Sequence, residues 1–143
     1  MIAVWAIGAL VVCGLLWWAR SVRARRSGGR NASQPLIPES LFKIVVTESE
    51  IIAHRPEGTI QRCAIGELRE LYIVTTSLGP WSPDVWWLFV NSAGGGCSFP
   101  QGATGEDEAL QFAQQLPGFD NAAFISAMGS TSDAKFLCWR AAA

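Results

Sequence analysis

Histidine and activated nucleophiles are scarce in this chain. His54 is the only histidine among 143 residues, and no serine or cysteine lies in a nucleophile motif such as GxSxG. Acid–base catalysis needs paired groups in one pocket, and a single histidine with scattered carboxylates offers no such pair. The sequence therefore predicts a protein that is not an enzyme, and a small enzyme is the weaker alternative.

Motifs for metals and other cofactors are also missing. The four cysteines are far apart and form no CxxC or Cys/His pair, which argues against zinc. The glycines at 94–96 lack the Lys-Ser/Thr pair of a phosphate-binding loop and are more typical of a hairpin turn. The acidic triplet 106–108 lacks the DxDxDG pattern of a calcium loop and suits a helix N-terminus. We expect neither a metal nor a cofactor.

Basic side chains are few beyond residue 30. From residue 35 onward, six Lys or Arg stand against twelve Asp or Glu, which gives this part a net charge of −6. Such a domain suits neither a nucleic acid backbone nor anionic lipid headgroups. We expect no nucleic acid partner. A protein partner with a basic surface fits the charge better.

Charge is absent altogether from residues 1–19, and five arginines follow within residues 20–30. A helix of this length spans roughly 28 Å, close to the hydrocarbon thickness of a bilayer. We therefore predict a transmembrane helix over 1–19 that anchors the chain in membrane lipid. Tryptophan and arginine side chains prefer the headgroup zone. The expected membrane-interface residues are Trp5, Trp17, Trp18, Arg20, Arg23, Arg25 and Arg26.

Two other interpretations of the apolar segment are weaker. A cleavable signal peptide has its basic residues before the apolar stretch and small residues after it, whereas bulky Trp17 and Trp18 and then arginines follow here. A buried core helix is disfavoured by nineteen uncharged residues that end at an arginine cluster.

The position of the arginines orients the chain. Basic flanks stay in the cytoplasm, so we expect a single-pass protein of the bacterial inner (cytoplasmic) membrane, with its N-terminus outside and its C-terminal domain in the cytoplasm. Cys63, Cys97 and Cys138 would then stay reduced. The opposite orientation predicts one disulfide and one free thiol among them.

Residues 20–40 form a basic juxtamembrane segment and a linker rich in Gly, Ser, Asn and Pro. A cytoplasmic domain is expected over 41–143. Its strand-like segments are 41–47, 50–55, 59–64, 71–76, 85–91 and a short one at 97–99. Short turns separate them, which favours an antiparallel sheet. Segment 65–70 is ambiguous between a helical turn and a bulge.

The second part of this domain has helical character. The acidic residues 106–108 precede a helical stretch that is expected over 109–116, and Pro117-Gly118 ends it. A second helix is expected at 121–128, with Asp120 as its cap. Segment 135–140 is either a last strand or a helix end. Consecutive strands followed by one or two C-terminal helices predict an α+β fold.

This order of elements resembles the bacterial pleckstrin-homology-like (PH-like) domains, in which a C-terminal helix closes a bent antiparallel sheet. The segments FKIVVTESEIIAHRPEG, AIGELRELYIVTT and DVWWLFV support the resemblance, which covers about residues 41–116. It implies a binding scaffold or a membrane-associated adaptor. Lipid-binding members use a basic loop near the first hairpin. Here that hairpin has Glu48, Glu50 and Glu57, so lipid-headgroup binding does not follow.

Tryptophan is abundant in the expected domain. Trp86 and Trp87 are adjacent on a strand and must point to opposite faces. One of them can enter the core, and the other needs a cover, which is the C-terminal helices, a partner or the membrane. Tryptophan is enriched at interfaces. The candidate partner-binding residues are Glu48, Glu50, Glu57, Trp81 and Trp87, followed by the 106–108 cluster.

Together these features predict a membrane-anchored, non-enzymatic protein-binding module. An inhibitor or immunity-type protein and an envelope adaptor both fit. The alternative is a structural subunit of a membrane complex, recruited through the anchor helix as well as the domain.

Overall fold

The computed structural model describes residues 37–78 and 83–143, which belong to one compact unit, Leu36–Ala143. The expected anchor over 1–19, with its membrane-interface residues, lies outside the described residues. So do positions 20–36 and Trp81. Within the described part, no helix is both long and apolar enough to cross a bilayer.

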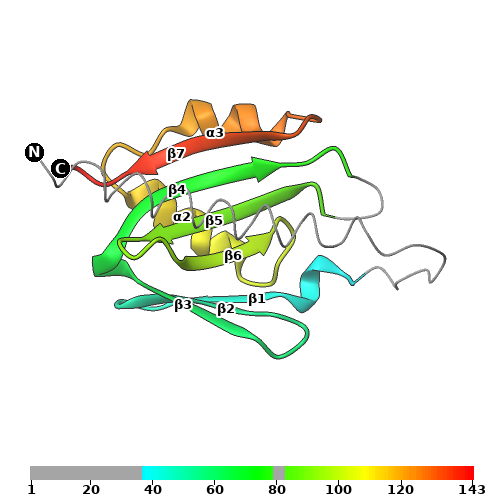
Figure 1. Cartoon of the computed structure of the whole chain (residues 1–143), viewed down its shortest axis with the longest axis horizontal. Helices are drawn as coiled ribbons and strands as arrows, with labels where there is room; N and C mark the ends of the chain where they lie inside the picture. The colour runs from blue at the N-terminus through cyan, green and yellow to red at the C-terminus, as the bar shows by residue number, and fades with distance from the viewer. Residues whose placement is uncertain (1–36, 79–82) are drawn as a thin grey trace, which may run out of the picture. The chain divides into compact units, whose positions relative to one another are not determined.

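The first sheet is an antiparallel meander of three strands. Figure 1 shows β1 (Lys43–Val46), β2 (Glu50–His54) and β3 (Ile60–Ala64) side by side. The three expected strands are confirmed. The strand expected from residue 41 begins at Lys43, because the 3-10 turn η1 (Glu39–Leu41) precedes it.

The second sheet is antiparallel and has four strands in the order β6-β5-β4-β7. Its strands are β4 (Leu68–Thr75), β5 (Val85–Asn91), β6 (Gly96–Pro100) and β7 (Ala134–Arg140). The apolar segment 85–91 is thus a strand, as predicted, and it lies in the interior of this sheet. The ambiguous segment 65–70 contains the 3-10 turn η2 (Ile65–Glu67) and a bulged start of β4.

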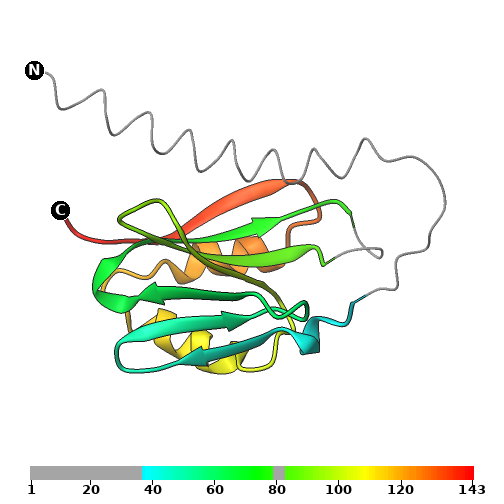
Figure 2. The same cartoon turned by 60° about the horizontal axis from the view of Figure 1, so that its bottom comes forward.

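Two helices, α2 (Glu106–Gln115) and α3 (Asn121–Met128), lie in the chain between β6 and β7. The Asp120 side chain accepts a hydrogen bond from the Ala123 amide at 2.9 Å, which confirms it as the cap of α3. The fold is α+β, with two antiparallel sheets and two helices. The helices are not the last elements, because β7 follows them and returns to pair with β4. Figures 1 and 2 show α3 beside β7, and α2 packs against β1.

The core lies where the two sheets and the helices meet. Its largest fully buried apolar side chains include Trp87, Phe89, Phe99, Ile51, Leu71 and Ile73. The Trp87 ring lies 5.7 Å from the ring of Phe99 and 5.4 Å from that of Phe124 on α3. Its indole N–H donates to Glu106 Oε1 at 2.9 Å, so the polar edge of the ring is also satisfied.

The other described tryptophans have intramolecular contacts as well. Trp86 is half-buried and meets the ring of Phe42 edge-on, with centroids 5.9 Å apart. The indole N–H of Trp139 donates to the Pro117 carbonyl at 2.9 Å. Packing within the domain therefore accounts for the tryptophans that the structure describes, and their number does not by itself indicate an interface.

Candidate functional site

A shallow, open groove lies between the β1–β2 turn (residues 47–49) and α2. Its lining residues are Val46, Thr47, Glu48, Ile65, Glu108, Gln111, Phe112 and Gln115. Half-buried Val46, Ile65 and Phe112 supply an apolar floor, whereas Glu48 and Glu108 are exposed. We call it the β1–α2 groove. Its residues come from three separate parts of the chain.

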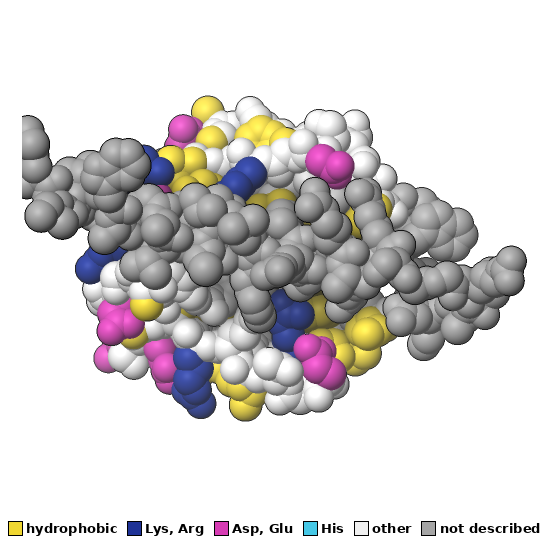
Figure 3. All heavy atoms as spheres, viewed as in Figure 1, with side chains coloured by type: hydrophobic (Ala, Val, Ile, Leu, Met, Phe, Trp, Pro, Cys, Tyr) yellow, Lys and Arg dark blue, Asp and Glu magenta, His cyan; other side chains and the backbone are white. Residues whose placement is uncertain are grey.

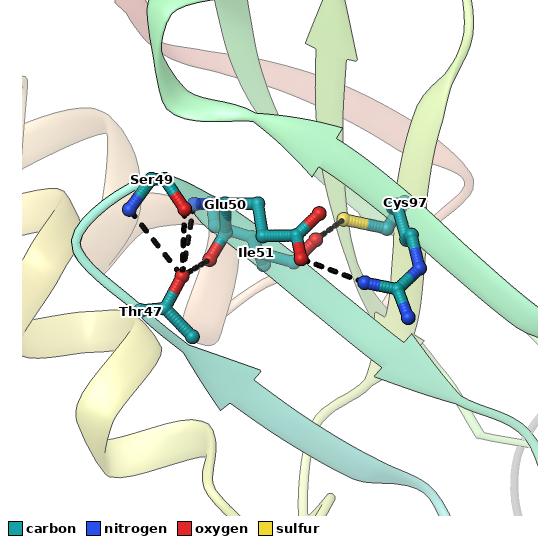
Figure 4. A network of polar contacts seen from close by, with 6 residues as sticks. Thr47, Ser49, Glu50, Ile51 and Cys97 are labelled. Atoms are coloured by element: carbon teal, nitrogen blue, oxygen red, sulfur yellow. Dashed lines mark hydrogen bonds and ion pairs between the residues drawn. The ribbon is translucent and has the colours of Figure 1, made fainter.

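The β1–β2 turn is held by its own hydrogen bonds, which Figure 4 shows. The Thr47 hydroxyl accepts from the amides of Glu50 at 3.0 Å and Ser49 at 3.3 Å. This is the usual local role of a threonine in a turn. The Ser49 carbonyl accepts from the Ile65 amide at 2.9 Å, which ties the turn to η2. Glu48 is therefore on a turn whose backbone is fixed on both sides.

The opposite wall, α2, is seated closely on β1. The Ile44 amide donates to the Thr104 carbonyl at 2.7 Å, just before the helix begins. Gly105 follows with φ of +91°, and a Cβ there would lie 2.2 Å from the Ile44 carbonyl oxygen. Ala109 and Ala113 form the buried face of α2. Small residues at these positions permit the close approach, which leaves Glu108 and Gln111 exposed.

The structure separates the predicted acidic candidates. Glu50 forms an ion pair with Arg62 at 2.6 Å. Glu57 is in the β2–β3 turn, at the other end of β2, with Arg55 at 4.0 Å. Glu48 instead shares the β1–α2 groove with Glu108, a member of the predicted 106–108 cluster. Within the described part of the chain, neither Glu48 nor Glu108 forms an ion pair.

The groove is therefore acidic as well as apolar. Its lining includes two carboxylates and no Lys or Arg. Charges of one sign beside apolar walls concentrate the local field and attract counter-charges. On the face drawn in Figure 3, side chains of both signs are scattered over the part that the described residues occupy.

Two aromatic candidates do not contribute to this groove. Trp87 is 0% exposed and belongs to the core, which corrects its expected role in partner binding. Trp81 lies outside the described residues. Sequence reasoning also missed Ile65 and Phe112. Ile65 lies in the ambiguous segment 65–70. Phe112 lies beside the apolar residues Leu110, Ala113 and Leu116, which share one face of the expected helix. Neither residue therefore has a clear local signal.

Side chains suited to catalysis are not gathered at the groove. Among residues 37–78 and 83–143, no three His, Cys, Asp or Glu side chains are placed to hold a metal ion. His54 ends β2, half-buried and opposite Ile60. The Thr47 hydroxyl is engaged in the turn. Exposed carboxylates beside an apolar floor are a feature that can attract a cationic segment.

No family model, curated protein or solved structure matches the chain. The function must therefore be inferred from the sequence pattern and from the geometry of the described domain.

Proposed function

We propose that this chain is a membrane-anchored, non-enzymatic module that binds a protein partner through the β1–α2 groove. The observation that supports this most is the pair Glu48 and Glu108, two carboxylates without an ion pair in the described part, beside an apolar floor. The partner presents Lys or Arg next to an apolar side chain. An inhibitor or immunity-type protein and an envelope adaptor both work by such non-covalent recognition.

The two parts of the groove have different tasks in this proposal. Burial of the partner's apolar side chain against Val46, Ile65 and Phe112 supplies most of the affinity, at about 25 cal/mol per Å² of apolar surface. The exposed carboxylates contribute less, because exposed ion pairs are worth about 0.2–1 kcal/mol each. They select a basic partner and speed its association.

We also propose a PH-like domain. Two antiparallel sheets with a helix against β1 support it, while the position of both helices ahead of β7 departs from the family pattern.

The site of action is proposed from the sequence. The uncharged run 1–19 and the arginines after it support an anchor with the domain on the cytoplasmic side. A reporter fused after Ala143 that is active only outside the cytoplasm should stay inactive. Activity of the reporter would show that the domain lies outside the cytoplasm and would contradict the proposed orientation.

A peptide selection tests the groove itself. The full chain in detergent micelles is presented with a displayed library of random peptides, and the selected peptides should be enriched in Lys or Arg beside apolar residues. The double variant Glu48→Lys/Glu108→Lys replaces two attractions by repulsions, a change of about 2 kcal/mol. Affinity for the selected peptides should then fall more than tenfold.

The matched control is Glu57→Lys/Asp84→Lys, which changes the net charge equally at two exposed positions outside the groove. It should alter affinity by less than about threefold, since distant exposed charges are largely screened by salt. Equal losses in both double variants would show that only net charge matters. That result would remove the groove from the proposal.

A further inference from the structure

Two cysteines meet where the sheets pack together. Cys63 on β3 and Cys97 on β6 are both free thiols, with 0% and 1% exposure. The Cys97 thiol donates to the Ile51 carbonyl at 3.8 Å, as Figure 4 shows. Ile51 is the direct cross-strand partner of Cys63 in the β2–β3 pairing. The Cys97 sulfur of the second sheet therefore lies next to the β2–β3 residue pair that contains Cys63.

The two thiols influence one another. The neighbouring Cys97 thiol lowers the pKa of Cys63. The neighbouring Cys63 thiol, together with burial, raises the pKa of Cys97. Thiolate is the reactive form of cysteine. Cys63 is therefore the first member of the pair to ionise and react, and Cys97 is placed to react second.

Cys138 provides an internal comparison. It is also 0% exposed, but it lies on β7 and its thiol bonds to the Phe136 carbonyl at 3.7 Å. Burial raises its pKa to about 11. Among the described residues, neither other cysteine is a contact of this thiol. Burial is therefore equal for the three cysteines, and only Cys63 and Cys97 form a pair.

We propose that Cys63 and Cys97 form a reversible disulfide between the two sheets when the domain meets a small disulfide oxidant such as oxidised glutathione. The Cys63 thiolate attacks one glutathione sulfur, forms a mixed disulfide and releases a glutathione thiolate. The Cys97 thiolate then attacks the Cys63 sulfur, and the second glutathione leaves. Two protein thiols are oxidised, one glutathione disulfide is reduced, and the cysteine protons end on the two glutathione thiols.

This bond would have structural consequences near the groove. It would join β3 to β6 and enclose β4 and β5 in a covalent loop. Closing such a loop restricts the unfolded chain and raises stability. Cys63 is two residues before Ile65, which lines the β1–α2 groove and bonds to the β1–β2 turn. Oxidation therefore makes that wall of the groove more rigid. Because both sulfurs are buried, the oxidant reaches them only after local opening of the fold.

Thiol counting on the full chain tests this inference. The purified chain in detergent micelles is reduced, treated under native conditions with oxidised glutathione, and then denatured with a maleimide mass tag. Tagged thiols should fall from the four of the sequence to two. A non-reducing digest should contain the peptides of Cys63 and Cys97 joined together. The oxidised chain should unfold at a higher temperature than the reduced chain, and a reductant should abolish the difference.

Single variants identify the partners. Cys138→Ala should still form the linked peptide, whereas Cys63→Ala and Cys97→Ala should each abolish every internal disulfide. The wild-type digest alone decides the matter if a variant does not fold. Four tagged thiols after the native treatment would overturn the proposal. So would a disulfide that includes Cys13 or Cys138, or one that forms only in denaturant.

Discussion

Neighbouring residues on β5 have different environments. Val85, Trp87 and Phe89 are buried in the core, whereas Trp86, Leu88 and Val90 are half-buried on the other face of the strand. Both faces are apolar, so the sequence does not show which of them meets the core. The sequence therefore does not distinguish Trp86 from Trp87, and it predicts a partner surface for Trp87, which packs inside.

The alternation on β5 predicts unequal costs for two adjacent truncations. Phe89→Ala should reduce the free energy of unfolding by about 3–5 kcal/mol, because it leaves a cavity between the sheets. Leu88→Ala should cost only about 1 kcal/mol, since complete burial of a leucine contributes about 1.5–3 kcal/mol and Leu88 is half-buried. Denaturant titration of both variants measures the difference. Similar costs would show that the two faces of β5 are equally enclosed.

Tyr72 is the only tyrosine of the chain, so its ionisation can be followed without interference. Its hydroxyl donates to Glu70 Oε2 at 2.9 Å, and Lys135 Nζ lies 3.8 Å from the ring centre. Burial raises the pKa of Tyr72, and the bond to Glu70 raises it further. A raised pKa means that the folded state favours the neutral phenol. This contribution to stability is complete below pH about 10 and is lost as the pH rises through the folded pKa.

A spectroscopic titration checks this shift. The phenolate absorbance of the native chain should rise with a midpoint above the ordinary value of about 10. Glu70→Gln should move the midpoint only part of the way back, because burial is the larger cause. A native midpoint at the value of an exposed tyrosine would show that Tyr72 is open to water.

At the scale of the elements, the close packing of α2 against β1 forms the β1–α2 groove. Gly105 makes it possible through its positive φ and the missing Cβ next to Ile44. Gly94 is a matched control, since its φ is +80° and an added Cβ would meet nothing within 4 Å. A comparison of substitutions at the two glycines separates the cost of backbone strain from the cost of a clash with β1.

Alanine at each glycine gives the corresponding prediction. Gly94→Ala should destabilise the fold by about 1 kcal/mol through backbone strain alone. Gly105→Ala should cost about 3 kcal/mol or more, because α2 must also move away from Ile44. It should weaken peptide binding at the groove as well, which Gly94→Ala should not. Equal stability changes would contradict the tight contact between α2 and β1.

Local signals predicted most elements correctly. The bounds 85–91 and 121–128 match β5 and α3, because a turn and a capping residue mark those ends in the sequence. Long-range pairing had no such signal. β7 pairs with β4 across more than fifty residues, with a bulge at Leu71/Tyr72. The place of β7 beside β4 and the division of the strands into two sheets therefore became visible only in the structure.

The same contrast between local signals and long-range contacts applies to the candidate site. Charge alone makes Glu48 and the 106–108 cluster candidates in the sequence, but nothing local indicates that Glu48 and Glu108 line one groove. Partners within the fold could not be read from the sequence either. Arg62 engages Glu50, and Trp87 engages Glu106. These contacts remove two of the named acids from the set available to a partner.

For the whole molecule, the net charge of −6 from residue 35 onward adds a long-range attraction to the local one at the groove. Association with a basic partner should therefore slow as salt increases through the range where the Debye length is about 8 Å. Stopped-flow measurements on the selected peptides check this, and the dissociation rate should change much less. Association that is independent of salt would contradict electrostatic steering.

Photo-crosslinking in living cells tests the central claim most directly. A photoreactive phenylalanine analogue placed at Gln111, an exposed residue of the β1–α2 groove, should link the anchored chain to one partner protein. The adduct should disappear in the Glu48→Lys/Glu108→Lys background and persist with Glu57→Lys/Asp84→Lys. The same analogue at Glu57 should give no adduct. An adduct that forms equally well from Glu57, or that survives reversal of both groove carboxylates, would contradict the account.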